Sequence, residues 1–295
     1  MFGTNWGLIL GGTILSGFLG LFSYRHSQSI IRQIQNTAIS GTDSPLNKTV
    51  LITGANRGLG QLLSKKMAEQ GWEVYVTARH PDLLSSEFKQ AGIEFKKCID
   101  WDLCAPASQQ KINQIFAEVP NTISAVIHCA SPYMKTPLLE SSPEQIAAYS
   151  NAMQNDILFS KTAVEQLKKS GNQSVLAISG AVIGLPHYFS LGMMGLLKAN
   201  QRQLAGVLDQ EVKACAGNKV HVRHVDLGCF VDHVTDPYTQ ISTEFVADSI
   251  IAAVNTPLAY PHEIHLLSPE NEKDFNVKST EVDNDVSHAH AHSKT

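Results

Sequence analysis

Short apolar, β-branched runs alternate with longer amphipathic stretches through most of the chain. The runs predict buried strands at residues 49–52, 73–77, 93–99, 125–129, 173–179, 219–225 and 263–267. The longer stretches predict helices at residues 60–70, 108–118, 142–170, 195–212 and 243–255, the last capped by Thr243. Strands that alternate with helices pair in parallel, because each helix forms the crossover that parallel neighbours need. We therefore expect one α/β domain built on a doubly wound parallel sheet.

A different apolar segment precedes this domain. Residues 6–22 carry no charge, and as a helix they would extend about 25 Å, just enough to span a bilayer. Trp6 and Tyr24 flank the segment, and basic residues follow it but none precedes it. The positive-inside rule then places the C-terminal part in the cytoplasm. We predict a single-pass anchor, one N-terminal transmembrane helix within residues 1–26; a cleaved signal peptide, a transit sequence and a buried helix are the alternatives.

Composition divides the rest of the chain into three parts. Residues 27–47 are polar and end in Gly, Asp, Ser and Pro, which is typical of a linker. Residues 48–269 hold the predicted domain, and residues 270–295 are charged and poor in aromatics, as in a disordered tail. Histidines alternate near the end of this tail, but alternation on a flexible segment is weak evidence for a metal site, and we predict none.

Charge and cysteine content narrow the function classes. The net charge of −4 comes without a basic cluster, so the chain lacks the electrostatic footprint of a nucleic-acid-binding protein. The five cysteines show no C-x-x-C spacing, and we interpret them as reduced thiols of an intracellular protein. They are Cys98, Cys104, Cys129, Cys215 and Cys229.

The clearest chemical signal is the stretch KTVLITGANRGLG at residues 48–60. A predicted strand runs into Thr53, three glycines follow at Gly54, Gly58 and Gly60, and a helix comes next. Glycine lets the backbone approach a ligand closely, and the helix presents free N–H groups and a positive dipole end. The stretch predicts a dinucleotide phosphate site, and a purely structural turn is the alternative.

The spacing T-G-x-x-x-G-x-G resembles that of the short-chain dehydrogenase/reductase family, whose members have a Rossmann fold. The resemblance extends over residues 48–269 and implies that the turn binds the cofactor. The cofactor-binding residues it implies in this turn are Thr53, Gly54, Asn56, Arg57, Gly58, Leu59 and Gly60.

The residue after the second strand predicts which dinucleotide is bound. A carboxylate there accepts a hydrogen bond from a ribose 2′-hydroxyl, whereas an arginine accommodates a 2′-phosphate. This chain has Arg79 at that place and Arg57 within the glycine turn. We expect NADP(H) as the cofactor, with NAD(H) as the alternative; both arginines could instead be solvated surface residues.

Three further family motifs are present in part. Asp102 and Leu103 match a D-V/L step whose acid lies by the adenine in the family. The sequence HCAS at residues 128–131 stands where the family usually has N-N-A-G, and only Ala130 is retained, which puts the usual fixing of the central sheet in doubt. After the sixth strand, Gly228 survives from a P-G pair that closes over the nicotinamide.

The chemical half of the resemblance is incomplete. Ser179 matches the serine that orients the substrate carbonyl, and Asn155 matches the asparagine that holds a helix kink and a relay water. The family also carries Tyr-x-x-x-Lys, in which the tyrosine is the acid or base and the lysine lowers its pKa. Counting along the chain puts those two positions at Ser190 and Met194.

Two displaced residues are candidates for the missing pair. Tyr188 lies two residues before Ser190, and Lys198 lies one helical turn after Met194. A lysine on a helix is more often simply solvated, and a small misplacement of an acid is costly. His187 is a further candidate acid, although a loop histidine is more often ordinary surface.

These patterns lead to two hypotheses. The first is a membrane-anchored oxidoreductase that uses NADP(H) on a small carbonyl or alcohol substrate. A lipophilic substrate would suit the location that the anchor gives the domain. The second is a catalytically silent NADP(H)-binding regulatory or scaffold protein that has lost the tyrosine and lysine. The resemblance also implies a homo-oligomer that pairs through the helices at residues 142–170 and 195–212.

Overall fold

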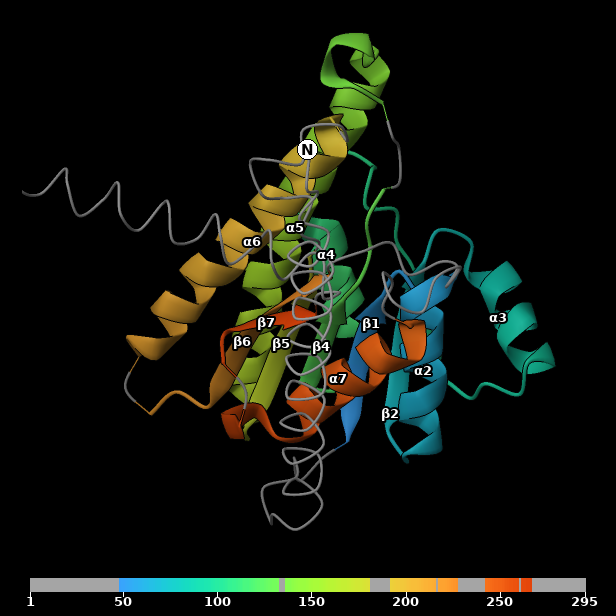
Figure 1. The fold of residues 1–295 in the computed structure, drawn as a ribbon. Helices are drawn as coiled ribbons and strands as arrows, with labels where there is room; N and C mark the ends of the chain where they lie inside the picture. Colours follow the sequence, from blue (N-terminus) through green and yellow to red (C-terminus); the bar gives the residue numbers. More distant parts are fainter. Residues whose placement is uncertain are drawn as a thin grey trace, which may run out of the picture.

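The computed structural model describes residues 48–132, 136–180, 192–215, 217–227, 242–259 and 261–266. Its seven strands form one sheet in the order β3-β2-β1-β4-β5-β6-β7, and every neighbouring pair is parallel (Figure 1). This confirms the predicted doubly wound sheet. The strands are β1 (Thr49–Thr53), β2 (Glu73–Ala78), β3 (Lys97–Asp100), β4 (Ala125–His128), β5 (Ser174–Ser179), β6 (Val220–Leu227) and β7 (Glu263–Leu266).

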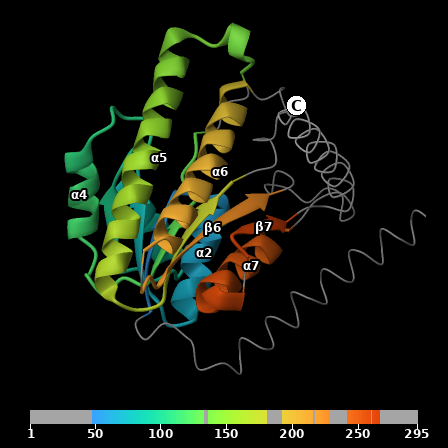
Figure 2. The same cartoon turned by 90° about the vertical axis from the view of Figure 1, so that its left-hand side faces the viewer.

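Helices cover both faces of the sheet. One layer holds α2, α3 and α7, and the other holds α4, α5 and α6 (Figure 2). Side chains of β1 alternate between these layers: Val50 and Ile52 pack with the first, whereas Leu51 packs with the second. The helices are α2 (Gly58–Glu69), α3 (Pro81–Gln90), α4 (Gln109–Ala117), α5 (Pro143–Ser170), α6 (Gly192–Lys213) and α7 (Thr243–Asn255), with short 3₁₀ turns at Leu138–Glu140 and Pro257–Ala259.

The strand order reverses between β1 and β4, and this reversal positions the site. Thr53 at the end of β1 is level with His128 at the end of β4. His128 in turn pairs with Ile178, one residue before the end of β5. In sheets of this kind ligands bind outside the carboxyl ends of the strands where the order reverses. The crevice is therefore expected above Thr53, His128 and Ser179.

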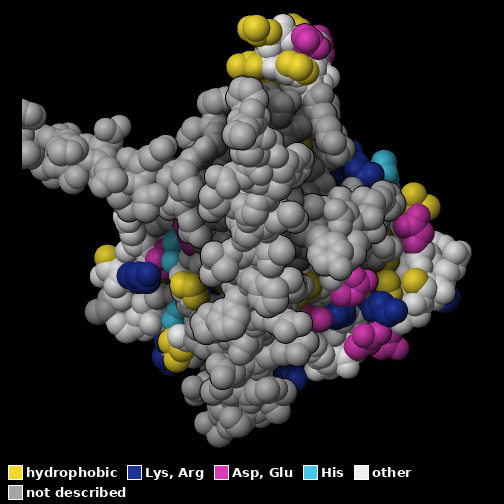
Figure 3. Space-filling model, viewed as in Figure 1, with side chains coloured by type: hydrophobic (Ala, Val, Ile, Leu, Met, Phe, Trp, Pro, Cys, Tyr) yellow, Lys and Arg dark blue, Asp and Glu magenta, His cyan; other side chains and the backbone are white. Residues whose placement is uncertain are grey.

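The long helix α5 begins and ends where local signals predict. The Ser142 hydroxyl accepts from the Gln145 N–H at 3.3 Å and the Gln145 side chain accepts from the Ser142 N–H at 2.9 Å, with Pro143 as the first helical residue. Gly171 ends the helix in the left-handed conformation at φ +69°. The amino end of α5 extends beyond the sheet, and exposed apolar side chains gather there, including Leu138 and Leu139 (Figures 2 and 3).

The structure differs from the predicted elements at three places. The third strand begins at Lys97 rather than at residue 93, because Ile93 and Phe95 pack against Phe88 of α3 instead of pairing. Helix α3 itself was not predicted, although Pro81 at its first position is a helix-start signal. Helix α7 is capped by Ser242, whose hydroxyl accepts from the Phe245 N–H at 3.1 Å, and not by Thr243.

Several predictions concern residues that the structure does not describe. The anchor within residues 1–26, the linker at 27–47 and the tail at 270–295 all lie outside the described ranges. Within those ranges, no helix is both long and apolar enough to cross a bilayer. The four described cysteines are free thiols, and Cys229 lies outside.

Candidate functional site

The glycine turn has the geometry of a close backbone approach. Gly54 and Gly58 have φ values of +73° and +59°, which favour glycine. A Cβ on Gly54 would lie 2.8 Å from the Cα and N atoms of Ala130, closer than real Cβ contacts. A Cβ on Gly60 would overlap with the carbonyl oxygen of Gly54. Each glycine therefore has a steric reason to be where it is.

The amino end of α2 is open toward this turn. Its N-cap residue, Arg57, is extended and makes no side-chain cap, and the first turn contains no acidic residue. The first N–H groups of a helix have no partner within the helix, and they favour an anion. The uncapped helix and the close-packed turn fit the pyrophosphate of a dinucleotide.

Arg57 within this turn and Arg79 are both exposed, and their part in selecting NADP(H) stays a prediction. Arg79 follows β2, the neighbour of β1. Burial and the charge of Asp102 raise the pKa of the Cys104 thiol. The charge of Arg79 lowers that pKa by less, so the net shift is upward. The side chain of Asp102 accepts a hydrogen bond from the N–H of Cys104 at 3.0 Å, which fixes the loop after β3.

Asn155 is buried on α5 and holds that same loop. Its Nδ2 donates to the carbonyl oxygens of Leu103 and Ala105, both at 2.9 Å. These bonds anchor the segment that follows β3 to α5 below the crevice. The structure thus gives Asn155 a positioning role, and its part in a proton relay stays a prediction.

Lys198 is buried, so the expectation that this lysine is solvated is wrong. Its side chain runs from α6 to the end of β5, where Nζ lies 3.4 Å from the carbonyl oxygen of Ser179. Nζ also donates to Oε1 of Gln201 at 2.9 Å. Burial lowers the pKa of Lys198, while the charges of Asp156 and Asp226 act in the opposite direction, with a net downward shift.

The position of Lys198 changes how the Tyr-x-x-x-Lys spacing is read. If the lysine that reaches the end of β5 is Lys198, the tyrosine position four residues earlier is Met194, which is also buried. Sequence counting had put the lysine position at Met194. A methionine has no proton to exchange, so an acid must come from elsewhere. Tyr188, Ser190, His187 and Gly228 lie outside the described residues.

Sequence analysis missed a buried pair behind this site. Nε2 of His128 lies 2.6 Å from Oδ1 of Asp156, and neither side chain is exposed. Nδ1 of His128 lies 2.7 Å from the hydroxyl of Thr53. The doubt over how the central sheet is fixed without the N-N-A-G motif is thereby resolved, because His128 ties β1 to α5. The available signal was a histidine ending an otherwise apolar strand.

His224 of β6 is a second buried histidine near the end of β5. Its ring fills the place where Gly180 would carry a Cβ, so Gly180 cannot be enlarged. Among the described residues neither ring nitrogen has a hydrogen-bond partner, and Nδ1 lies 4.0 Å from Oε1 of Glu263. Burial lowers the pKa of His224 to about 4, which keeps the ring neutral at physiological pH.

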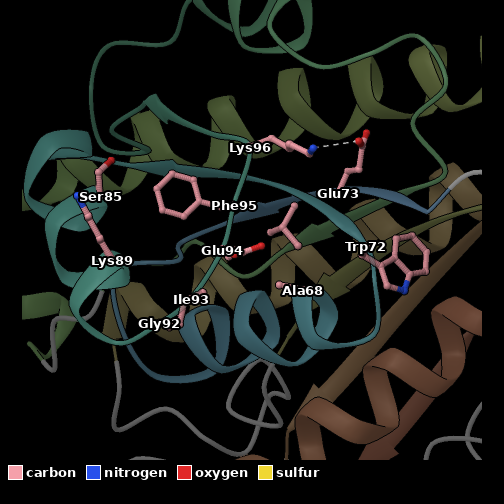
Figure 4. Close-up of a pocket in the computed structure, with 11 residues that line it drawn as sticks. Ala68, Trp72, Glu73, Ser85, Lys89, Gly92, Ile93, Glu94, Phe95 and Lys96 are labelled. Atoms are coloured by element: carbon pink, nitrogen blue, oxygen red, sulfur yellow. Dashed lines mark ion pairs between the residues drawn. The ribbon is translucent and has the colours of Figure 1, made fainter.

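An open groove of about 630 Å³ lies elsewhere, between the end of α2, the start of β2 and the end of α3 (Figure 4). Trp72, Lys89 and Phe95 are among its lining residues, and Lys96 forms an ion pair with Glu73 across 3.3 Å. The groove is at the amino end of β2, whereas the glycine turn is at the carboxyl end of the sheet. It is therefore separate from the cofactor crevice.

The chain matches a known family over most of the predicted domain, and it matches known relatives over part of its length. The family model for short chain dehydrogenase matches residues 48–240, more than half of the chain. A tropinone reductase homolog from Arabidopsis thaliana is 26% identical over 165 residues, covering 53% of this chain and 61% of the relative. A diacetyl reductase, (S)-acetoin forming, from Staphylococcus epidermidis is 23% identical over 174 residues, covering 57% and 66%. The chain thus spans less than two thirds of the length of these relatives.

Solved structures share the fold. A short-chain dehydrogenase from Sphingobium yanoikuyae in complex with NADPH has a TM-score of 0.62 at 18% identity, covering 80% of this chain and 95% of the other. Acetoin dehydrogenase from Salmonella typhimurium has a TM-score of 0.62 at 15% identity, covering 76% and 97%. At these identities the likeness shows the fold alone.

Proposed function

This chain belongs to the short chain dehydrogenase family, and we propose that it is an oxidoreductase that transfers hydride between a nicotinamide dinucleotide and a carbonyl or alcohol. The observation that carries this proposal is buried Lys198, whose ammonium reaches the carboxyl end of β5. Removing an ammonium from water costs several kcal/mol, roughly, even when it is partnered. Groups held at such a cost in a crevice are more often functional than structural.

Different residues would bind the cofactor, orient the substrate and transfer the proton. The turn from Thr53 to Gly60 and the open end of α2 would hold the pyrophosphate. When bound, the nicotinamide supplies or accepts the hydride. The Ser179 hydroxyl orients the substrate oxygen, and Lys198 places a positive charge where negative charge develops on that oxygen. Tyr188 supplies the proton, as the tyrosine does in the family, where the positive charge of the lysine lowers the pKa of that tyrosine.

NADP(H) is the cofactor we propose, with NAD(H) as the alternative. Arg57 and Arg79 support this preference because both are exposed beside the turn and a guanidinium pairs well with a phosphate. We also propose that the N-terminal segment anchors the domain to a membrane on its cytoplasmic side and that its substrate is lipophilic. The exposed leucines at the amino end of α5, Leu138 and Leu139, support this location, since they add apolar surface that lipid would cover.

A second candidate is a silent NADP(H)-binding protein. It is favoured by Met194, because the tyrosine position defined by Lys198 then carries no acid. Fold membership alone does not decide between the two candidates.

The test uses the full-length chain in two steps. Fluorescence titration with NADPH and NADH measures binding, and a panel of carbonyls that includes diacetyl and tropinone, taken from the relatives' names, measures NADPH consumption. We expect tighter NADPH binding and turnover that Lys198→Met and Tyr188→Phe abolish. Lys161→Met, which removes an exposed lysine of α5, is the matched control and keeps the activity. Binding without turnover across the panel supports the silent candidate, and failure to bind either nucleotide overturns both.

A further inference from the structure

Five buried polar side chains form one continuous chain of hydrogen bonds between the glycine turn and Lys198. They come from β1, β4, α5 and α6, and none is more than 6% exposed. The links are 2.7 Å between Thr53 and His128, 2.6 Å to Asp156, 3.0 Å to Gln201 and 2.9 Å to Lys198. These hydrogen bonds therefore connect the end of β1 to the lysine that reaches the end of β5.

The position of each proton follows from the donors and acceptors present. The hydroxyl of Thr53 accepts from the backbone N–H groups of Cys129 and Ala130, both at 3.1 Å. Both of its lone pairs are then occupied, so it must donate its own proton to Nδ1 of His128. A histidine that accepts at Nδ1 is neutral and carries its proton on Nε2. His128 consequently donates to Asp156.

The donors and acceptors around Asp156 also determine its charge. Oδ1 accepts from His128, and Oδ2 accepts from Nε2 of Gln201. A carboxyl group that accepts at both oxygens is ionised. The amide of Gln201 can face only one way, because Lys198 offers donors alone and needs Oε1 as its acceptor. One negative and one positive charge thus face each other across a single amide.

We propose that Asp156 is the buried counter-charge of Lys198, and that His128, Asp156 and Gln201 are positioning residues that hold the lysine protonated and aimed at the substrate crevice. This inference rests on the proposed hydride-transfer function. Because Thr53 also fixes the backbone of Ala130 against Gly54, the same network sets the lysine relative to the nucleotide turn.

Other titratable groups also face Lys198. Cys129, after β4, is a neutral thiol, since burial raises its pKa to about 12. On β6, His224 is neutral, and the charge of Asp226 also favours the protonated form of Lys198. Asp226 is thus the competing counter-charge. Asp156 differs from it in being joined to the lysine through a hydrogen-bonded amide.

The first experiment measures pH profiles of kcat and of kcat/KM on the full-length chain. An opposite charge within about 4–6 Å raises a lysine pKa by about 1–3 units, and the amide of Gln201 stands between Asp156 and Lys198, so the low end of that range applies. Asp156→Asn should therefore move the alkaline limb to lower pH by about 1 unit, and Asp226→Asn should move it less. His128→Gln, which keeps one acceptor and one donor, should leave the profile in place. A larger shift in Asp226→Asn than in Asp156→Asn would overturn the inference.

A second measurement does not depend on activity. NMR of lysine side chains enriched in ¹³C at Cε reports the charge of Lys198 directly, with Lys198→Met used to assign its signal. The titration of that signal should move to lower pH in Asp156→Asn. If Asp156→Asn does not fold, Gln201→Met takes its place, because it removes the bridging amide and keeps the carboxylate; a smaller shift in the same direction is expected.

The two proposals fail separately. A shifted lysine titration together with no turnover in the native chain supports the counter-charge and overturns hydride transfer. Turnover in the native chain, with neither the profile nor the lysine titration moved by Asp156→Asn or Gln201→Met, overturns the counter-charge alone.

Discussion

The two ends of the crevice differ in how their geometry arises. At the glycine turn, a strand, three glycines and an uncapped helix follow one another within residues 49–60, so local sequence determines the backbone. At the other end, Lys198 depends on contacts between residues 28 and 45 positions apart in the chain. Under the proposed function, the first region binds the nucleotide through its backbone and the second acts through buried side-chain charge. A substitution should therefore lower the stability of the fold most where charged side chains are buried together.

The largest effect on stability should come from His128→Leu. Leucine removes the donor to Asp156 and the acceptor for Thr53, which leaves a buried carboxylate short of a partner. We expect the free energy of unfolding to fall by about 3–5 kcal/mol. His128→Gln keeps both links and should cost far less. Urea denaturation of the two variants checks this, and equal losses would show that ring packing rather than hydrogen bonding accounts for the site.

A nearly equal effect is expected from His224, but only in acid. Its pKa is about 4 in the folded chain and about 6.5 when unfolded, so below pH 6.5 the unfolded chain binds the extra proton. The stability that neutral His224 contributes is full above pH 6.5 and is lost as the pH falls to about 4. The loss amounts to about 3 kcal/mol.

Unfolding measured from pH 7.5 to 4 tests this. His224→Leu should flatten the curve over that range, whereas His80→Leu, which removes an exposed histidine, should leave it unchanged. A curve that stays as steep without His224 would assign the acid sensitivity to other groups.

The same contrast explains which features the sequence could predict. The turn from Thr53 to Gly60 was predictable because glycine, strand and helix signals are contiguous. The bounds of α5 were predictable for a similar reason, since Pro143 and Gly171 mark its ends. Ile93 and Phe95 have the apolar pattern of a strand but pack under α3, and periodicity does not distinguish those two uses.

The buried charges were beyond sequence reasoning for a physical reason. A lysine, a glutamine and an aspartate are ordinary on a helix surface, and only tertiary packing turns Lys198, Gln201 and Asp156 toward each other. Counting from a motif assigned the lysine position to Met194, and it could not show that the buried lysine is Lys198. His128 carried a signal as a departure from N-N-A-G, but its partner on α5 could not be named from spacing.

At the glycine turn the effects should be smaller but steric in origin. Gly60→Ala forces a Cβ into the carbonyl oxygen of Gly54, and overpacking of this kind costs about 1–3 kcal/mol. Nucleotide binding should weaken with it, because the turn and the helix end move apart. Gly206→Ala in α6 is the matched control, since its Cβ would have room, 3.9 Å from the nearest atom, His262 Nε2. That change should stabilise the chain by about 0.5–1 kcal/mol, and thermal unfolding distinguishes the two signs.

The smallest effect should be on the selectivity between NADPH and NADH. Arg79→Ala removes an exposed charge that follows β2, so folding should not change. If Arg79 pairs with a 2′-phosphate, NADPH affinity should fall by about tenfold, equivalent to about 1.4 kcal/mol, while NADH affinity stays the same. Lys65→Ala, on the exposed surface of α2, should change neither affinity. Fluorescence titration measures the affinities for both nucleotides. Equal losses of affinity for NADPH and NADH would mean that Arg79 does not pair with the 2′-phosphate. In that outcome the turn would still bind through its backbone, and Arg57 would be the remaining guanidinium beside the turn to explain any preference.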